Sequence, residues 1–421
     1  DKSRYLGVGT NKKYYLHEGG AFFDITPVRL TTAAGDATFA ASNGSSTITV
    51  TENGHGAIAG DFVTFSGAAS LGGNITANVL NQEYEIQTIV NENSYTITAR
   101  SEETTIASIT DDGVINRTAV TANSSDSGNG GGSVVAAYQI NAGLDTSVTG
   151  GGWGAGTWGR STWNGDADIT VTSSILRIWT HDNFGEDLII NVRDGDIFYW
   201  DTSAGTGTRS VKLSDRTNAD AGTPTVAKQV IVSDVDRHVI CFGCDAVGAI
   251  GTQDPLLIRF SSQEDPTTWI PSATNTAGDL RIGSGSEIIA AVETRQQILV
   301  ITDVSVHSMQ FLGPPFTFGV QMISENITIR SPQAAVAVDD TVFWMGVQEF
   351  YVYNGSVKKL PCSVKDHVFS DFNADQAEKV IAGVNSSFGE IWWFYPSANS
   401  TENDKYVIYN YEQQIWYIGS L

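Results

Sequence analysis

Residues 189–200 spell Ile-Ile-Asn-Val-Arg-Asp-Gly-Asp-Ile-Phe-Tyr-Trp, two short apolar runs separated by Asp194-Gly195. Asp-Gly provides the positive φ angles that a two-residue turn between antiparallel strands requires. Residues 350–360 repeat this design, with Asn354-Gly355 between the two runs. Helical periodicity is nearly absent, and the best helical stretch is residues 373–380. These patterns predict an all-β fold built from antiparallel hairpins.

Hairpins of this kind recur through the C-terminal part of the chain. From about residue 168, a strand-rich unit repeats at roughly 40–55 residues, which is the period of propeller blades. The units contain the apolar runs that start at Ile175, Lys228, Glu287, Ala334 and Lys379. A single sheet cannot cover both of its own faces, whereas sheets packed around an axis cover one another. We therefore expect a β-propeller over residues 168–421.

The N-terminal part divides into three segments by composition. Residues 1–29 are expected to form the first visible propeller strands, whose missing partner strand lies upstream or comes from the C-terminus. Residues 30–118 alternate apolar side chains with Thr, Ser and Asn, which predicts a small all-β domain inserted in a propeller loop. Residues 119–167 are rich in Gly, Ser and Trp, and we expect a connecting loop that is mobile over Thr121–Ser133. Because the chain begins without Met, we also expect residues upstream.

The Gly-rich part of this loop carries three tryptophans at five-residue spacing. Trp153, Trp158 and Trp163 stand among glycines, with Arg160 between the last two. Exposing an indole to water is unfavourable, so these side chains need cover. Either the loop folds over its own propeller, or it forms a contact between subunits. The candidate interface residues are Trp153, Trp158, Arg160 and Trp163.

The charge balance limits the classes of partner. The chain has 47 acidic and 24 basic residues, for a formal net charge of -23. Such a surface repels phosphate backbones and anionic membranes, which disfavours a sequence-reading nucleic-acid binder. The same acidic surface is compatible with a conduit through which DNA slides without binding. No stretch approaches the roughly 18–20 apolar residues that span a bilayer.

Metal sites have weak support in the sequence. Cys241 and Cys244 have the spacing of half a zinc site and His238 lies beside them, but no second pair follows. The apolar run around Cys241 favours buried thiols, and three cysteines fit a reducing cytosol. The Asp194-Gly195-Asp196 turn lacks the spacing of a calcium loop. We expect no metal and no cofactor.

One segment leaves a carbohydrate function open. Residues 262–269, which end in Asp265-Pro266-Thr267-Thr268-Trp269, resemble the Asp-box turn of sialidase propellers, with Pro266 at the glycine place. A sialidase also needs a clamp of three arginines, and candidates that nothing marks as a triad are Arg193, Arg237, Arg259, Arg281, Arg295 and Arg330. Carboxylates placed where catalytic groups could lie are Asp303, Glu349 and Glu390, and we expect them to be solvated. We expect no enzyme, and a structural turn at residues 262–269.

Four features together resemble a known family. They are the Gly/Trp loop, the run Asp265–Trp269 followed by Gly278-Asp279-Leu280, the segment Phe311–Phe316, and the Asn354-Gly355 hairpin. Over residues 135–421 they resemble the tail nozzle proteins of short-tailed bacteriophages, also called tail tubular or stabilisation proteins. The inserted segment is similar to a small β domain of phage structural proteins, on His55, Gly60-Asp61 and Val63.

The resemblance implies a structural role in the virion. The chain would be a propeller-bearing subunit of a homohexameric tail ring, assembled in the host cytoplasm, that forms part of the DNA exit conduit below the portal and adaptor. Its neighbours would be the head-to-tail adaptor and tail fibre or spike proteins. DNA would pass without sequence-specific binding, with no membrane involved. The alternative function is a propeller that binds or cleaves host surface glycans.

Overall fold

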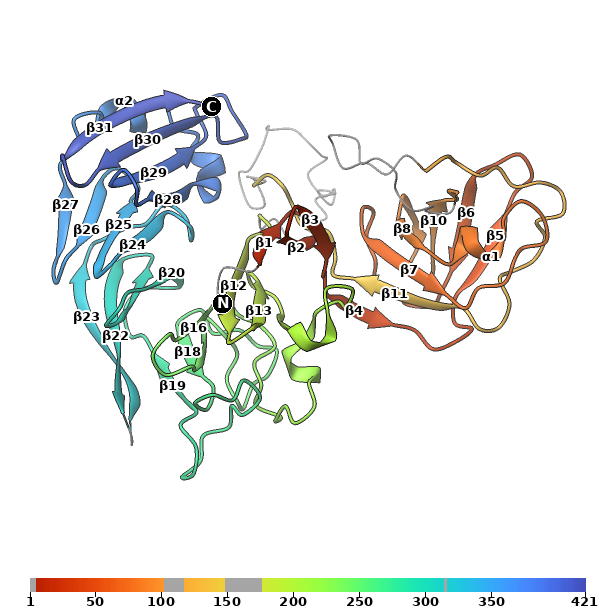
Figure 1. The fold of residues 1–421 in the computed structure, drawn as a ribbon, viewed down its shortest axis with the longest axis horizontal. Coiled ribbons are helices and arrows are strands. Elements are labelled where there is room, and N and C mark those ends of the chain that lie inside the picture. Colours follow the sequence, from red (N-terminus) through yellow and green to blue (C-terminus); the bar gives the residue numbers. More distant parts are fainter. Residues whose placement is uncertain (1–4, 102–116, 148–175, 314–315) are drawn as a thin grey trace, which may run out of the picture. The chain divides into compact units, whose positions relative to one another are not determined.

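The computed structural model describes residues 5–101, 117–147, 176–313 and 316–421 (Figure 1). Nearly all of its regular structure is antiparallel β-sheet, so the prediction of a propeller-like, all-β fold is confirmed. The chain folds into two compact units. The first comprises Leu144–Ser203 and Val211–Leu421, and the second comprises Arg4–Gly143 and Ala204–Ser210.

The described residues of the first unit form five four-stranded sheets in which neighbouring strands follow chain order. Sheet 1 has β12 (Trp179–Phe184), β13 (Asp187–Val192), β14 (Ile197–Trp200) and β15 (Val211–Lys212). Sheet 2 has β16 (Gln229–Val232), β17 (Val239–Phe242), β18 (Leu257–Phe260) and β19 (Gly278–Arg281). Sheet 3 has β20 (Ile288–Glu293), β21 (Ile298–Thr302), β22 (Ser305–Gly313) and β23 (Thr317–Glu325).

Two further sheets complete this set in the described chain. Sheet 4 has β24 (Ala335–Val338), β25 (Thr341–Met345), β26 (Phe350–Tyr353) and β27 (Val357–Leu360). Sheet 5 has β28 (Ile381–Asn385), β29 (Glu390–Tyr395), β30 (Lys405–Asn410) and β31 (Ile415–Ser420). Short helices lie between strands: η1 (Thr202–Ala204), η2 (Leu213–Asp215), α2 (Lys365–Ser370) and η3 (Ala374–Lys379).

The two turns on which the fold prediction rests are both hairpins. Asn191 pairs with Ile197 across the first turn, where Asp194 has a φ of 55°. Tyr353 pairs with Val357 across the second, where Gly355 has a φ of 92°. A positive φ is favourable for Gly and tolerated by Asp, which is why these residue types mark the turns.

Successive sheets pack through their first strands and through aromatic side chains. The strands β12, β16, β20, β24 and β28 contact one another in chain order, and Figure 1 shows the sheets following one another in this order. Between sheets 4 and 5, the ring of Phe350 lies 5.0 Å from that of Trp393 and 4.8 Å from that of Trp416. The buried Trp393 indole donates a hydrogen bond to the Ala334 carbonyl at 3.0 Å, so its polar atom is satisfied across the sheet boundary.

The helical segment expected at residues 373–380 links sheet 5 to sheet 1. It forms the 3-10 helix η3, and the Asn373 side chain caps its first turn. From η3, Glu378 accepts two hydrogen bonds of 2.9 Å from the guanidinium of Arg193, which follows β13. Gln376 exchanges hydrogen bonds with the backbone of Ser147 at 2.9 and 2.8 Å. These contacts join sheet 1 to the segment that leads into sheet 5.

The described residues of the second unit form three sheets. One is three-stranded, with β1 (Leu6–Gly9), β2 (Tyr14–Glu18) and β3 (Ala21–Asp24). A second has the order β5 (Thr38–Ala41), β6 (Thr47–Thr51), β10 (Ser94–Thr98), β9 (Thr88–Asn91). The third has the order β4 (Val28–Thr31), β11 (Val135–Gln139), β7 (Phe62–Ser66), β8 (Glu83–Glu85), and the helix α1 is Ala77–Leu80.

Three observations bear on the expected organisation of the N-terminal part. The stretch expected as a connecting loop contains β11, which pairs with both β4 and β7 and so completes a sheet of the small domain. The carboxylate of Asp126 holds residues near it by accepting hydrogen bonds from backbone N–H groups of Gly73, Asn74, Ile75 and Asn123. The last strand β31 pairs with β30, so it completes sheet 5 instead of donating a strand to β1–β3.

We predict that the Arg193–Glu378 contact stabilises the first unit. The Arg193 side chain is 8% exposed, so Glu378→Gln leaves a nearly buried guanidinium without its charge partner and should lower the free energy of unfolding by about 1–3 kcal/mol. Thermal denaturation measures the change. Arg281→Gln is the control, because its pair with Asp254 is 58% and 32% exposed and should contribute little. Equal losses would contradict the proposed linkage.

Candidate functional sites

The candidate interface residues Trp153, Trp158, Arg160 and Trp163 lie outside the described residues. The structure therefore tests neither of the two roles considered for their loop.

The Cys241–Cys244 pair is buried in sheet 2. Both thiols are free and fully buried, and burial raises the pKa of Cys244 to about 12. A protonated, buried thiol is a poor metal ligand. Over the described ranges, no group of three or more His, Cys, Asp or Glu side chains is arranged to hold a metal ion.

The Asp-box-like segment uses its polar atoms internally. Asp265 accepts hydrogen bonds from the Thr267 N–H at 2.8 Å and from the hydroxyls of Thr267 and Thr268 at 2.6 and 2.7 Å. Burial acts to raise the pKa of Asp265, but these hydrogen bonds outweigh it and hold the pKa below the ordinary value. Trp269 is fully buried, and its indole donates to the Pro266 carbonyl at 2.8 Å. The segment forms a structural turn that is also tied to its surroundings, since the Trp269 N–H donates to Asp220 at 2.7 Å.

Each of the six candidate arginines has a partner of its own, and most of the arginines lie in the segments between strands. Arg193, Arg237, Arg259, Arg281 and Arg295 pair with Glu378, Glu264, Asp245, Asp254 and Asp339, and Arg330 lies over the Phe372 ring. The candidate carboxylates are also engaged. Glu349 pairs with Lys359 and Lys365, Asp303 accepts hydrogen bonds from Ser286, and Glu390 accepts one from the Trp392 indole. These groups are dispersed and do not form a shared anion clamp within the described structure.

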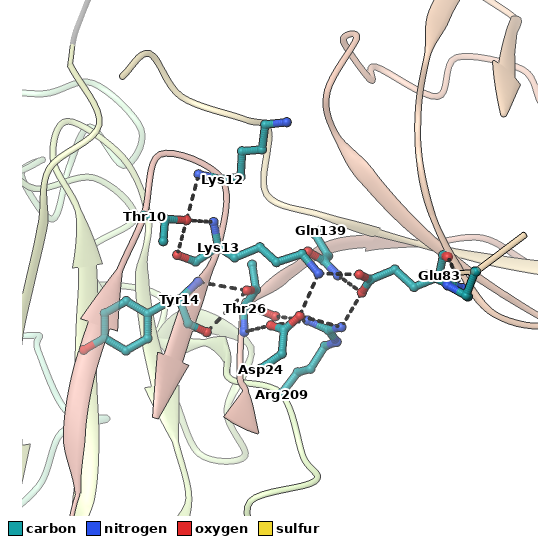
Figure 2. A network of polar contacts seen from close by, with 10 residues as sticks. Thr10, Lys12, Lys13, Tyr14, Asp24, Thr26, Glu83, Gln139 and Arg209 are labelled. Atoms are coloured by element: carbon teal, nitrogen blue, oxygen red, sulfur yellow. Dashed lines mark hydrogen bonds and ion pairs between the residues drawn. The ribbon is translucent and has the colours of Figure 1, made fainter. Parts of the chain in front are cut away.

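The second unit holds a network of charged side chains that the sequence analysis did not single out (Figure 2). Lys13 precedes β2, Asp24 ends β3, Glu83 begins β8, and Arg209 lies in the segment between β14 and β15. Asp24 pairs with Lys13 and with Arg209, each at 2.9 Å. Glu83 pairs with Lys13 and, at 2.7 Å, with Arg209. The network thus joins two sheets and a distant chain segment.

This network neutralises itself. Two cations lie between two carboxylates, and Gln139 of β11 donates a further hydrogen bond to Glu83 at 2.5 Å. Burial acts to raise the pKa of Asp24, but Lys13 and Arg209 outweigh it and hold the pKa below 3.8. No charge is left over for a ligand, so the arrangement acts as a clamp within the second unit.

A long hairpin, β22–β23, extends beyond its sheet. Its strands have nine residues each, whereas the other described strands of the first unit have six or fewer. The neighbour β21 pairs with β22 only as far as Met309, so the outer part of the hairpin projects (Figure 1). Leu312 and Phe316 are 60% and 73% exposed at its end. No Asp, Glu, Lys or Arg occurs between Asp303 and Glu325. This hairpin is an uncharged, apolar projection on an acidic protein.

A buried histidine of sheet 2 anchors the hairpin. The His238 ring lies 5.2 Å from the Phe318 ring and 6.1 Å from the Phe311 ring, and its Nε2 atom is 3.0 Å from the Thr276 hydroxyl. Burial lowers the pKa of His238 to about 4. Thr317, at the start of β23, donates a hydrogen bond to the Thr276 carbonyl at 3.1 Å. Sheet 2 therefore fixes the direction in which the hairpin projects.

A polar hollow of about 400 Å³, open to solvent, lies between sheets 3 and 4. It lies where the β20–β21, β24–β25 and β26–β27 turns meet the start of the projecting hairpin. Its lining consists mainly of amide, hydroxyl and carboxylate groups, from Gln296, Gln297, Gln310, Asp340, Thr341, Tyr353, Asn354 and Gly355. We call it the amide hollow.

Comparisons with known proteins identify no family. No family model matches the sequence, and no curated protein matches it. Similar solved structures include the extracellular domain assigned to a one-component system, BT4673, of B. thetaiotaomicron (11% identity, 57% of this chain and 27% of that one, TM-score 0.34). Others are the phage phi92 endosialidase (11%, 94% and 53%, 0.24) and Citrobacter koseri AztD (7%, 99% and 80%, 0.36). All are distant likenesses, and no function is transferred from them.

We predict that the charged network stabilises the second unit. Glu83→Gln leaves Lys13 and Arg209 sharing one carboxylate, and these cations are 12% and 26% exposed. The loss of stability should be about 1–3 kcal/mol, measured by hydrogen exchange of β2 and β8. Glu85→Gln is the control, since its pair with Lys12 is 38% and 40% exposed and should contribute little. The pKa of Asp24 is lower in the folded chain than its ordinary value of 3.8. The ionised Asp24 therefore contributes fully to the stability of the fold above pH 3.8, and this contribution is lost as the pH falls below that value.

We also predict that acid weakens the anchoring of the hairpin. The pKa of His238 is about 4 when folded and near 6.5 when exposed. The stabilisation is therefore complete above pH 6.5 and is lost as the pH falls from 6.5 to 4, because the released imidazole binds the proton more readily. Hydrogen exchange of Phe311 and Phe318 should accelerate over this range. His238→Phe should flatten the pH dependence, and an unchanged profile in that variant would refute the assignment.

Proposed function

We propose that the chain is a structural ring subunit of a short-tailed phage tail, forming part of the conduit for DNA. The observation that carries this proposal is the projecting hairpin β22–β23. Exposing a large apolar side chain to water forgoes about 1.5–3 kcal/mol of burial free energy, and Leu312 and Phe316 are both exposed. Contact with a neighbouring copy would cover them.

Charge supports the choice of a second copy of the chain as the partner. Copies with a net charge of -23 repel one another, so their contact surfaces should lack charge. The hairpin from Val304 to Ser324 has this property. The same acidic character would let DNA pass along the conduit without adhering. Within the described residues, no helix is long and apolar enough to span a membrane.

The remaining parts of the proposal follow from the family resemblance. The ring would be a hexamer in the virion tail, adjoining the head-to-tail adaptor and the tail fibre or spike proteins. Trp153, Trp158, Arg160 and Trp163 would supply a second contact between copies. The subunit would act without a cofactor and without catalysis.

We predict that Leu312→Ser with Phe316→Ser prevents ring assembly without unfolding the subunit. Both side chains are exposed in the single chain, so folding loses little, whereas an apolar contact between copies is lost. Light scattering after size exclusion and negative-stain images measure the assembly, and circular dichroism measures the fold. Val235→Ser is the control, because Val235 is 75% exposed outside the hairpin and should leave the ring intact. A wild-type chain that is monomeric in both assays would rule out the proposal.

A further inference from the structure

The amide hollow is organised by one side chain, Gln297, whose amide nitrogen and amide oxygen both make hydrogen bonds. Its Nε2 atom donates to the Tyr353 hydroxyl at 2.7 Å, and its Oε1 atom accepts from the Ser308 hydroxyl and, at 3.2 Å, from the Gln310 amide. Tyr353 accepts this hydrogen bond and keeps its own hydroxyl proton to donate. Gln297 thereby orients both Tyr353 and Gln310 before any ligand arrives, which lowers the entropy lost on binding.

An exposed ion pair, which contributes little to stability, links two turns beside the hollow. Arg295, in the β20–β21 turn, pairs with Asp339, in the β24–β25 turn, at 2.5 Å. The Thr294 hydroxyl donates to the Gln297 carbonyl at 2.8 Å and closes the first of these turns. Sheets 3 and 4 also share one hydrophobic core, to which Ala290 and Val342 belong. The two walls are therefore positioned by the fold and need no ligand to bring them together.

Several polar groups of the hollow are available to a ligand. In the described structure, the side chains of Gln296, Asp340 and Thr341 make no hydrogen bond to other protein groups. Gln310 keeps its carbonyl oxygen and one N–H free of Gln297. The hollow thus offers both donors and acceptors, which suits a molecule that carries adjacent hydroxyl groups. A volume of about 400 Å³ lies within the range of small-ligand sites, about 300–1,000 Å³.

Charge selects among polyhydroxylated ligands. The rim cation Arg295 is neutralised by Asp339, and Asp340 is the carboxylate that lines the hollow. An acidic sugar would meet Asp340 and a protein of net charge -23, so a neutral sugar is favoured. Glycoside hydrolysis in most families uses two carboxylates that flank the bond. The described lining supplies one, which indicates binding without cleavage.

We propose that the amide hollow between sheets 3 and 4 is a binding site for neutral glycans. The side chains that contact the sugar are Gln296, Gln310, Asp340, Thr341 and Tyr353. Asp340 accepts from one or two adjacent hydroxyls, and the glutamine amides both donate and accept. The site differs from the proposed ring contact in most of its groups, although Gln310 shares the strand β22 with Leu312.

The test is binding of the full chain to an array of neutral and acidic bacterial glycans, followed by calorimetry with the best neutral oligosaccharide. We expect retention of neutral glycans and none of sialylated ones. Each lost hydrogen bond contributes about 1 kcal/mol, so Asp340→Ala and Gln310→Ala should each weaken binding about fivefold or more. Asp340→Asn should admit acidic sugars, because it removes the repelling charge and keeps the hydrogen-bonding shape.

Gln321→Ala is the matched control, since it removes an exposed amide from the same hairpin outside the hollow. It should leave the affinity unchanged. The proposal is overturned if no neutral glycan is retained, or if Asp340→Ala and Gln310→Ala bind as tightly as the wild type. Release of reducing sugar from a bound oligosaccharide would overturn the assignment of binding without cleavage. If negative-stain images show a ring and no glycan on the array binds, the glycan-site proposal is wrong and the ring proposal is unaffected.

Discussion

The packing of one sheet on the next is the constraint on which the first unit depends. Inner strands such as β14 and β21 are buried along their whole length, so both faces of these strands are covered. Water is excluded from such a sheet only if neighbours cover it on each side. The aromatic side chains of sheets 4 and 5 achieve this with satisfied indole N–H groups, for example Trp393 on the Ala334 carbonyl. The recurring hairpin unit, the short turns and the rigid base of the projecting hairpin all follow from this arrangement.

Charged groups have a secondary, positioning role in both units. In the first unit, the ion pair of Arg193 and Glu378 connects sheet 1 with the segment that leads into sheet 5. In the second unit, a charged network holds together parts that are distant in sequence; its members are Lys13, Asp24, Glu83 and Arg209. In both places cations and anions balance. The large net negative charge therefore resides on other, more exposed carboxylates, where it shapes the choice of partner without disturbing the fold.

The two surface features proposed as sites differ in chemistry and both involve the hairpin β22–β23. The hairpin β22–β23 is uncharged and apolar at its end, and the amide hollow is polar. Gln310 belongs to both the hairpin and the hollow. The extended hairpin carries the apolar side chains at its end, and it contributes one lining side chain, Gln310, to the hollow.

The sequence by itself determined the all-β class, the hairpin turns at Asp194-Gly195 and Asn354-Gly355, and the recurring unit, because turn chemistry and strand alternation are local properties. It missed β11, since the Gly- and Ser-rich residues around a short strand obscure its pattern and only pairing with β4 and β7 stabilises it. The tertiary structure decided which charges meet: Lys13, Glu83 and Arg209 are separated by 70 and 126 residues. It likewise decided that three separate turns face one hollow. Contacts of this kind arise from the packing of sheets, which no local pattern in the chain records.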